Sequence, residues 1–588
     1  MDSLHHEQNN FKPFIPAEKR VSEFTATSVI LGIILAVLFG GANAYLGLRV
    51  GMTVSASIPA AVISMGVIRI ILRKDSVLEN NMVQTIGSAG ESLAAGAIFT
   101  MPVLFMWAAE GKSTMPGLGE IALICICGGA LGVFFMIPLR SALIVQEHGV
   151  LPYPEGTACA EVLLAGEKGG AKAGTVFAGL GIAAVYKFIA DGLRVFPSEV
   201  DFEVKSYKGA GIGIDVLPAL LGVGYICGVR VASYLLAGGV TAWFVIMPVI
   251  ALFGEDAVLY PATVPISELG AWGIWSNYIR YIGAGAVAAG GIFSLIKALP
   301  LIIRTFAQAV RGYGKNMEEE SRTSQDIPIR VVLVGILITA IVMWLIPVIP
   351  VNLPGAILIV VLGFFFATVS SRMVGLVGSS NNPVSGMAIA TLIITAAIYK
   401  SSGAAAEGMV SSIAVGTIIC IIAAMAGDTS QDLKTGYIVG ATPKKQQYGE
   451  LISVVVSSMA IGGILYLLNA AWGYGSSELP APQATLMKMV VEGVMGGNLP
   501  WNLVFAGVAL AVAAEILTIP VLPFAVGLYL PIHLSTPMAV GGLVRFWIEK
   551  KRGEEEEDQK QMIESGILYS SGLIAGEGLI GILLAVFA

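Results

Sequence analysis

The chain of 588 residues is 56% hydrophobic and only 13% charged, and its mean hydropathy is +0.81. An ordinary soluble domain is about 25% charged, so this composition excludes a soluble globular protein. The formal net charge is −6, because acidic residues outnumber basic ones. This balance gives no reason to expect a nucleic-acid partner. The lipid bilayer is therefore the expected environment.

Apolar stretches long enough to cross a bilayer recur along the chain. About 20 residues of helix span a hydrocarbon core of roughly 30 Å, and this measure predicts about sixteen transmembrane helices. The predicted fold class is an all-α polytopic integral membrane protein with some re-entrant or broken segments. The expected spans are residues 29–48, 57–71, 83–107, 121–145, 174–193, 214–227, 232–253, 281–303, 331–349, 357–377, 383–399, 410–426, 451–472, 503–520, 522–546 and 562–587.

Four regions are expected along the chain. They are a tail over residues 1–24, a first transmembrane half over 25–305, a central loop over 306–328 and a second transmembrane half over 329–588. Lys and Arg gather in the central loop, whereas the acidic loop 254–270 contains neither, which predicts a cytoplasmic N-terminus. The basic loop 545–552 also favours the cytoplasm and would send the C-terminus outside, so the side of the C-terminus stays open.

A short match between the two halves indicates an internal duplication. Residues 51–59 and 375–383 share the spacing Gly-x3-Ser-x3-Pro. A chance match among 71 glycines is the alternative. Internal repeats are how many transporters place a substrate site at the membrane midplane.

Three segments combine Pro, Gly and polar residues between apolar stretches, and none of them can continue a helix. They are residues 151–156 (LPYPEG), 378–383 (GSSNNP) and 529–537 (YLPIHLSTP). Unwound backbone at membrane depth must line water or be buried in protein, so these segments are candidates for a substrate pathway. Ordinary interfacial turns are the alternative.

Ionisable residues within apolar stretches cost about 2.5 to 3.5 kcal/mol each on insertion scales, so they usually face a cavity, a partner or a pathway. Glu91 and Glu577 are surrounded by small residues that let helices approach closely. Burial disfavours the charged form of a carboxyl group, as a proton-coupled carrier requires. Glu91, Glu515 and Glu577 are therefore proton-coupling candidates. Alternatively, such carboxylates only pair with arginines such as Arg49 or Arg372 to hold the helices together.

The motifs of membrane enzymes are incomplete in this sequence. Residues 111–114 (GKST) lack the first glycine and the strand–helix context of a phosphate loop. The Gly427-Asp428 pair lacks the preceding glycine of an intramembrane aspartyl protease, because position 425 is Met425. No enzyme activity, cofactor or metal site is predicted. A passive channel is the competing transport class.

Four segments resemble the signature segments of the oligopeptide transporter family. They are residues 43–53 (NAYLGLRVGMT), 153–162 (YPEGTACAEV), 427–437 (GDTSQDLKTGY) and, as in the prokaryotic branch, 571–577 (SGLIAGE). They extend from the first span to the last, so the resemblance covers essentially the whole chain. It implies about sixteen helices, secondary active transport and a bacterial-type cytoplasmic membrane.

The resemblance also implies the substrate class: small peptides, thiol peptides or metal complexes of peptide-like chelators, taken up with protons. The chain lacks the long N-terminal extension and the Pro-Tyr-rich motif of the peptide-transporting fungal and plant branch, which leaves a metal-chelate substrate as the alternative. The residues do not decide the oligomeric state, for which a homodimer is one arrangement to test.

A peptide needs a cation for its carboxylate, acidic groups for its ammonium and amide partners for its backbone. Arg49, Arg372 and Lys434 are candidates for the first role, Glu155, Glu161, Asp428 and Asp432 for the second, and Asn381, Asn382 and Gln431 for the third. Tyr153 joins this set through its motif. For residues 427–437, an alternative interpretation is a helix N-terminus capped by Asp428, Gln431 or Asp432.

Overall fold

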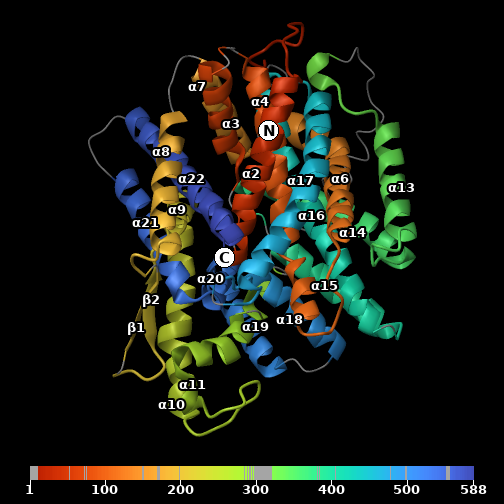
Figure 1. Ribbon diagram of the computed structural model, residues 1–588. Helices are drawn as coiled ribbons and strands as arrows, with labels where there is room; N and C mark the ends of the chain where they lie inside the picture. Colours follow the sequence, from red (N-terminus) through yellow and green to blue (C-terminus); the bar gives the residue numbers. More distant parts are fainter. Residues whose placement is uncertain are drawn as a thin grey trace. The chain divides into compact units, whose positions relative to one another are not determined.

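The computed structural model confirms an all-α polytopic membrane protein (Figure 1). It describes residues 11–587 except 52, 54, 72, 74–75, 149–150, 168–172, 198, 205, 284, 288, 291–292, 294–295, 297–320, 380–381, 383, 404, 477, 497–499 and 551–555. Within these residues, 10 helices are long and apolar enough to cross a membrane. The expected number of about sixteen stays a prediction, because shorter apolar helices accompany these ten and part of the expected span 281–303 lies outside the described residues.

The contacts divide the chain into two compact units, each built from a segment of either predicted half. Unit 1 comprises residues 1–174, 295–495 and 585–588, and unit 2 comprises residues 175–294 and 496–584. The helices of unit 1 are α2 (Ala26–Val50), α3 (Ser57–Met65), α4 (Val77–Ile98), α5 (Pro102–Ala109), α6 (Leu118–Arg140), α7 (Pro154–Glu167), α13 (Ile329–Leu345), α14 (Leu353–Val377), α15 (Val384–Ser401), α16 (Ala405–Val439), α17 (Pro443–Trp472) and α18 (Pro482–Gly496). Shorter turns are η1 (Gly66–Ile71), η2 (Ser141–Gln146) and η6 (Arg322–Ser324).

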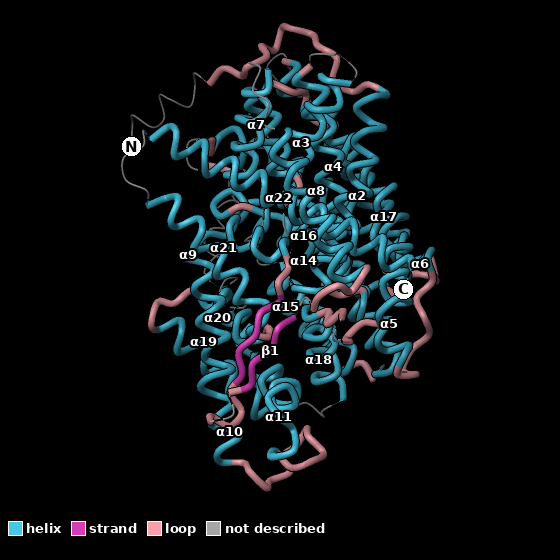
Figure 2. The backbone as a smooth tube through the Cα atoms, turned by 60° about the vertical axis from the view of Figure 1, so that its left-hand side comes forward, coloured by secondary structure: helices cyan, strands magenta, loops and turns pink. Residues whose placement is uncertain are grey.

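Unit 2 holds the remaining helices and a two-stranded sheet. Its elements are α8 (Ala173–Lys187), η3 (Phe188–Gly192), β1 (Glu199–Glu203), β2 (Gly211–Asp215), α9 (Pro218–Val240), η4 (Thr241–Ile246), α10 (Met247–Phe253), α11 (Ile266–Ile274), η5 (Trp275–Ile279), α19 (Trp501–Ile516), α20 (Val521–Tyr529), α21 (Ile532–Lys550) and α22 (Glu556–Phe587). Strands β1 and β2 pair antiparallel and stand out against the helices in Figure 2. The hairpin was not predicted, and it occupies the start of the expected span 214–227. Apolar and other residues alternate along both strands, which is a period of two rather than of a helix.

A helix break lies in each of the three predicted segments, but residues 154–156 and 532–537 of these segments are helical, and Pro537 lies inside α21. Residues 151–153 are not helical, and α7 begins directly after them at Pro154. Helix α14 ends before Gly378, whose φ of 85° is accessible chiefly to glycine. Leu530 and Pro531 separate α20 from α21. In addition, Gly228 interrupts α9 with non-helical dihedral angles, which accounts for the two separate spans expected on either side of it.

The predicted repeat is matched by a break in each half, but its register differs from the sequence match. In the first half, Gly51 ends α2 in a left-handed conformation. In the second half, the residue that ends α14 is Gly378 and not Gly375, which lies within the helix. The duplication itself stays a prediction.

Helix α16 is the central element of unit 1, and it packs against α4, α6, α7, α14, α15 and α17. Small residues make these close approaches possible, as is usual where membrane helices pack. A Cβ atom added to Gly96 of α4 would lie 2.6 Å from the Cα of Ile421. One added to Gly132 of α6 would lie 2.6 Å from the Cβ of Met425. Backbones this close bury any polar side chain that α16 carries between them.

The N-terminal strap, residues 11–23, covers the C-terminal end of α16. The amides of Phe14 and Ile15 donate to the carbonyls of Ile438 and Val439 at 3.1 and 3.0 Å. Farther along, both carboxylate oxygens of Glu23 accept hydrogen bonds from Thr442 at 2.8 Å.

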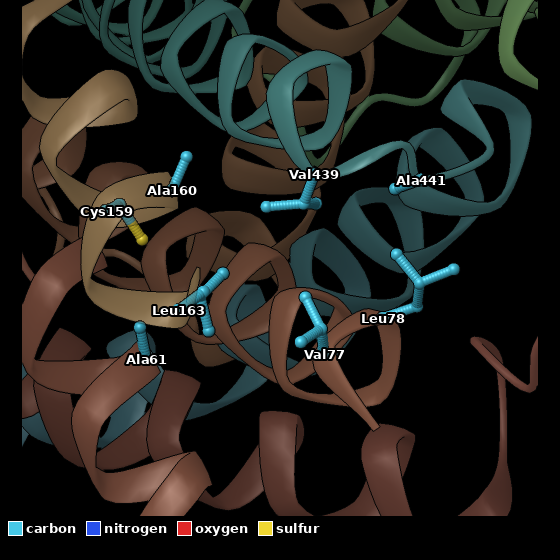
Figure 3. Packing of buried hydrophobic residues seen from close by; sticks show 8 residues of the cluster. All are labelled: Ala61, Val77, Leu78, Cys159, Ala160, Leu163, Val439 and Ala441. Atoms are coloured by element: carbon cyan, nitrogen blue, oxygen red, sulfur yellow. The ribbon is translucent and has the colours of Figure 1, made fainter. Parts of the chain in front are cut away.

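The side chain of Ile15 packs on a buried apolar cluster beneath the strap, which Figure 3 shows. The eight residues of this cluster are Ala61, Val77, Leu78, Cys159, Ala160, Leu163, Val439 and Ala441. The described part of the predicted tail is thus packed on unit 1.

Candidate functional site

Helix α16 carries two polar faces within the interior of unit 1. Asp428 and Asp432 lie one turn apart on the face that meets α4 and α17, because residues four apart share a helix face. Gln431, Lys434 and Thr435 lie on the face that meets α7 and the chain before it. The helix runs unbroken through all five residues. The alternative interpretation of this segment as a capped helix N-terminus is therefore wrong.

Two acidic side chains where the first face meets α4, Asp432 of α16 and Glu91 of α4, have hydrogen-bond donors on both oxygens. Asp432 accepts from the Gln84 amide at one oxygen and from the Ser88 hydroxyl, at 2.6 Å, at the other. Glu91 accepts from the Asn43 side chain and, at 3.4 Å, from the backbone amide of Ala56. Gln84, Ser88 and Glu91 form one stripe along α4, spaced by four and three residues.

Glu450 of α17 completes this face. Its Oε2 atom accepts a hydrogen bond of 2.7 Å from the Thr429 hydroxyl of α16. Gln446 lies one turn earlier on α17 and donates to the Asp432 carbonyl at 2.9 Å and to the Thr85 hydroxyl at 3.1 Å. Polar side chains thus connect α4, α16 and α17.

Asp428 lies at the centre of an acidic cluster, because its charge can interact with four other carboxyl groups. The acidic cluster consists of Glu91, Glu155, Asp428, Asp432 and Glu450. Asp428 is 2% exposed, and Asp432 and Glu450 are 0% exposed. Among the residues that the structure describes, neither these three nor Glu91 forms an ion pair with Lys or Arg. Charge of this density in a membrane interior needs neutralisation.

On the second face, Gln431 joins α16 to two neighbouring helices. Its side-chain oxygen accepts from the Gly156 amide of α7 at 2.7 Å, and its side-chain amide donates to the Val374 carbonyl of α14 at 3.2 Å. The Thr435 hydroxyl donates to the Gly156 carbonyl at 2.8 Å. These contacts hold the start of α7, and with it Glu155, against α16.

Lys434 is buried against the non-helical segment that precedes α7. Its ammonium group donates to the His148 Nδ1 atom at 2.8 Å and to the Leu151 carbonyl at 3.2 Å, and it lies 5.4 Å from the centre of the Tyr153 ring. Burial, together with the neighbouring Lys434 charge, lowers the pKa of His148 from 6.5 to about 4. His148 is therefore neutral at physiological pH and can accept the ammonium hydrogen.

Tyr153 and Glu155 fix the break before α7 to the break after α14. Tyr153 has a φ of 47°, which is uncommon for a residue other than glycine. Its amide donates to the Gly375 carbonyl at 2.9 Å, and its hydroxyl donates to the Ser371 carbonyl at 3.1 Å. Glu155 accepts from the Ser379 amide at 3.0 Å.

The remaining predicted substrate residues differ in placement. Arg372 pairs with Glu147 at 2.8 Å, and the Asn382 amide donates to the Ser370 hydroxyl at 2.7 Å. Arg49 is buried at the end of α2 and donates to the Tyr45 hydroxyl at 3.0 Å. Two more predicted residues complete the set: Glu161 is exposed on α7, and Asn381 lies outside the described residues.

The other two proton-coupling candidates belong to unit 2. Glu577 accepts from the Ala219 amide at 2.8 Å, at the N-terminus of α9, and its other oxygen lies 3.9 Å from the Lys187 ammonium. Lys187 also pairs with Asp191, one helical turn farther on. Glu515 lies near the end of α19 and is partly exposed. Their roles in proton coupling stay predictions.

Several residues of the site were not singled out from the sequence. Glu450 stands one residue before the expected span 451–472, so it was not counted among the intramembrane acids. The polar stripe of Gln84 and Ser88 was a usable signal, since uncharged polar residues at helical spacing interrupt an otherwise apolar segment. In the described part of the chain, no group of three or more His, Cys, Asp and Glu side chains is arranged to hold a metal ion.

Comparison with known proteins agrees with this architecture. Residues 23–588 match the family described as OPT oligopeptide transporter protein. The chain is 33% identical to a Haemophilus influenzae protein named "Putative oligopeptide transporter", with 92% of each chain covered. It is 25% identical to the "Metal-nicotianamine transporter YSL3" of Arabidopsis thaliana, over 98% of this chain and 93% of the relative. The chain therefore belongs to the oligopeptide transporter family and is a membrane transporter, not an enzyme.

Proposed function

We propose that this protein takes up a small peptide or peptide-like compound together with protons, and that unit 1 binds both. The observation that carries the proposal is the acidic cluster around Asp428. Four of its carboxyl groups are buried without a Lys or Arg partner among the described residues. Their charge must be offset by protons, by a cationic group of the substrate, or by both.

The two faces of α16 suit a substrate that carries both signs of charge. Asp432 and Glu91 have donors on both oxygens, which fix the two carboxyl groups in place, and an ammonium group of the substrate would offset their charge. On the other face, Lys434 contacts neutral acceptors and forms no ion pair among the described residues. An unpaired buried cation is a suitable partner for a substrate carboxylate.

A metal chelate is the second candidate substrate, and the Arabidopsis relative named as a metal-nicotianamine transporter favours it. Such a chelate also presents carboxylate and amine groups, so the same residues could recognise it. The Haemophilus relative, at higher identity, is named for oligopeptides, and we therefore place peptides first. We further propose the bacterial cytoplasmic membrane as the location, with the N-terminus in the cytoplasm.

Proteoliposomes test this function. A labelled small-peptide mixture and a labelled metal–nicotianamine complex are offered separately, with an inside-alkaline pH gradient and with the gradient collapsed. For one proton per substrate, one pH unit is worth about 1.4 kcal/mol and supports roughly tenfold accumulation. Accumulation that disappears with the gradient would support proton symport and identify the substrate class. Equilibration of both substrates without accumulation would instead indicate a passive channel and refute the proposal.

A further inference from the structure

The carboxyl groups of the acidic cluster differ in how completely their oxygens are hydrogen-bonded. Asp432 and Glu91 each have a donor on both oxygens. Hydrogen bonds donated to a carboxylate stabilise its ionised form. These two groups have no unpartnered oxygen, and we assign them to the binding of a cationic substrate group, whose charge would offset theirs.

Glu450 and Asp428 are arranged differently. Glu450 is fully buried, and its Oε1 atom has no hydrogen-bond partner among the described residues. The Oδ2 atom of Asp428 is buried and likewise without a partner there. Buried polar atoms are nearly always hydrogen-bonded, so two unpartnered carboxyl oxygens in one cluster require an explanation.

Protonation supplies that explanation. A neutral carboxylic acid has one O–H donor and needs fewer donors from its surroundings than a carboxylate does. A buried oxygen that lacks a donor, beside the charges of neighbouring acids, favours the neutral form of the carboxyl group. The acids that act electrostatically on this pair all belong to the acidic cluster: Asp432 on the same helix as Asp428, Glu91 on α4 and Glu155 on α7.

We infer that Glu450, together with Asp428, is the proton-binding site of the transport cycle, whereas Asp432 and Glu91 bind the substrate. A proton from water on one side binds the free oxygen of Glu450, and the same proton is released to water on the other side. Glu450 was not among the residues predicted to couple protons. This inference rests on the proposed function, because a proton site has no role in a passive channel.

The position of Thr429 explains how this site can communicate with the substrate. Thr429 donates the one hydrogen bond that Glu450 receives among the described residues, and it is adjacent to Asp428 in the chain. Asp432 lies on the same face of α16, one turn farther on. A change in the charge of Asp432 can therefore act on the proton site through a single helix.

The test is Glu450→Gln in proteoliposomes, with the exposed Glu478→Gln as the matched control. A glutamine keeps an oxygen for the Thr429 hydroxyl and imitates the neutral acid. With a one-unit pH gradient, the wild type and Glu478→Gln should accumulate substrate up to about tenfold for each proton coupled. Glu450→Gln should let the substrate reach equal concentrations on both sides without accumulating it. It should still exchange labelled for unlabelled substrate.

Two results would overturn the inference. Accumulation by Glu450→Gln equal to that of the wild type would show that the proton binds elsewhere, with the proposed function intact. Suppose instead that Glu450→Gln elutes and unfolds like the wild type but loses both exchange and accumulation. That result would assign Glu450 to substrate binding. A wild type that does not respond to the gradient would instead refute the proposed function.

A second variant keeps the inference testable if Glu450→Gln does not fold. Thr429→Val removes the hydroxyl that donates to Glu450 and nearly preserves the side-chain volume. Loss of this donor disfavours the ionised carboxyl group, so the pH at which uptake is half-maximal should rise. An unchanged pH profile in folded, active Thr429→Val protein would contradict a proton site at Glu450.

Discussion

Replacing Gly156 with alanine tests the packing that holds the predicted substrate residues together. A Cβ atom at this position of α7 would lie 2.9 Å from the Gln431 side-chain oxygen and closer still to the Gln431 carbonyl oxygen. The carbonyl belongs to the backbone of α16, so it cannot turn away and one of the two helices must move. Insertion of an extra group into a packed interior costs about 1 to 3 kcal/mol.

The change of Gly to Ala returns about 1 kcal/mol in helix propensity. We therefore expect Gly156→Ala to be less stable than the wild type by up to about 2 kcal/mol, the difference between these two effects. Glu155 should lose its fixed position against the Ser379 amide, so the affinity for substrate should fall as well.

Gly463→Ala in α17 is the matched control, because no heavy atom lies within 4 Å of the added Cβ atom. It gains the same propensity without the overlap and should unfold at or slightly above the wild-type temperature. The assay is the apparent unfolding temperature of each purified protein in the same lipid nanodiscs, followed by substrate binding. If Gly156→Ala unfolded at or above the temperature of Gly463→Ala, the described contact between α7 and α16 would be refuted.

Three further predictions concern the end of α16. Lys434→Met leaves the His148 ring and the Leu151 carbonyl without their donor. Each unsatisfied group costs about 1 to 3 kcal/mol of folding free energy, so the unfolding temperature should fall. An unchanged temperature would contradict the assigned hydrogen bonds. Because the pKa of His148 is lowered from 6.5 to about 4, the unfolded chain binds its proton first as the pH falls. The protein should therefore become less stable as the pH falls from 6.5 to about 4. His148→Gln should reduce this change of the unfolding temperature with pH. Equal slopes for the wild type and His148→Gln would refute the assignment of this pH dependence to His148. Gly440→Ala should detach the N-terminal strap, since Gly440 has a φ of 85° and an added Cβ atom would lie 3.1 Å from the carbonyl carbon of Ile15. Faster tryptic cleavage after residues 19 and 20 would show this detachment, and unchanged cleavage would contradict it.

The fold class and the helix breaks follow from local properties of the chain. Composition alone requires a membrane environment, and the Pro and Gly residues of 151–156 and 378–383 end helices without reference to the rest of the protein. The hairpin was missed because each strand is only five residues long, and the last two residues of β2 were assigned to the apolar span that follows. Span boundaries are the least certain part of such a prediction, and one boundary drawn after Glu450 removed it from the list of acids.

The candidate site could be predicted only in part, because its contacts join distant segments. Asp432 and Asp428 were singled out by a motif, but their partners Ser88 and Glu450 belong to other helices, and the hydrogen bond from Ser88 to Asp432 spans 344 residues. Periodicity shows which side chains share a face of α4 or α16, but it does not show which faces meet. The same small-residue surroundings favoured Glu91 and Glu577 equally, whereas the structure gives Glu577 a lysine partner at 3.9 Å and a helix N-terminus.

The central claim is that substrate and proton move together through the acidic cluster of unit 1. A pH-sensitive dye trapped inside proteoliposomes measures this directly when substrate is added outside without an imposed gradient. The account predicts that substrate entry acidifies the lumen of wild-type vesicles. Substrate that enters through Glu450→Gln should leave the lumenal pH unchanged. Entry of substrate into wild-type vesicles without any change in lumenal pH would contradict proton-coupled transport by this protein.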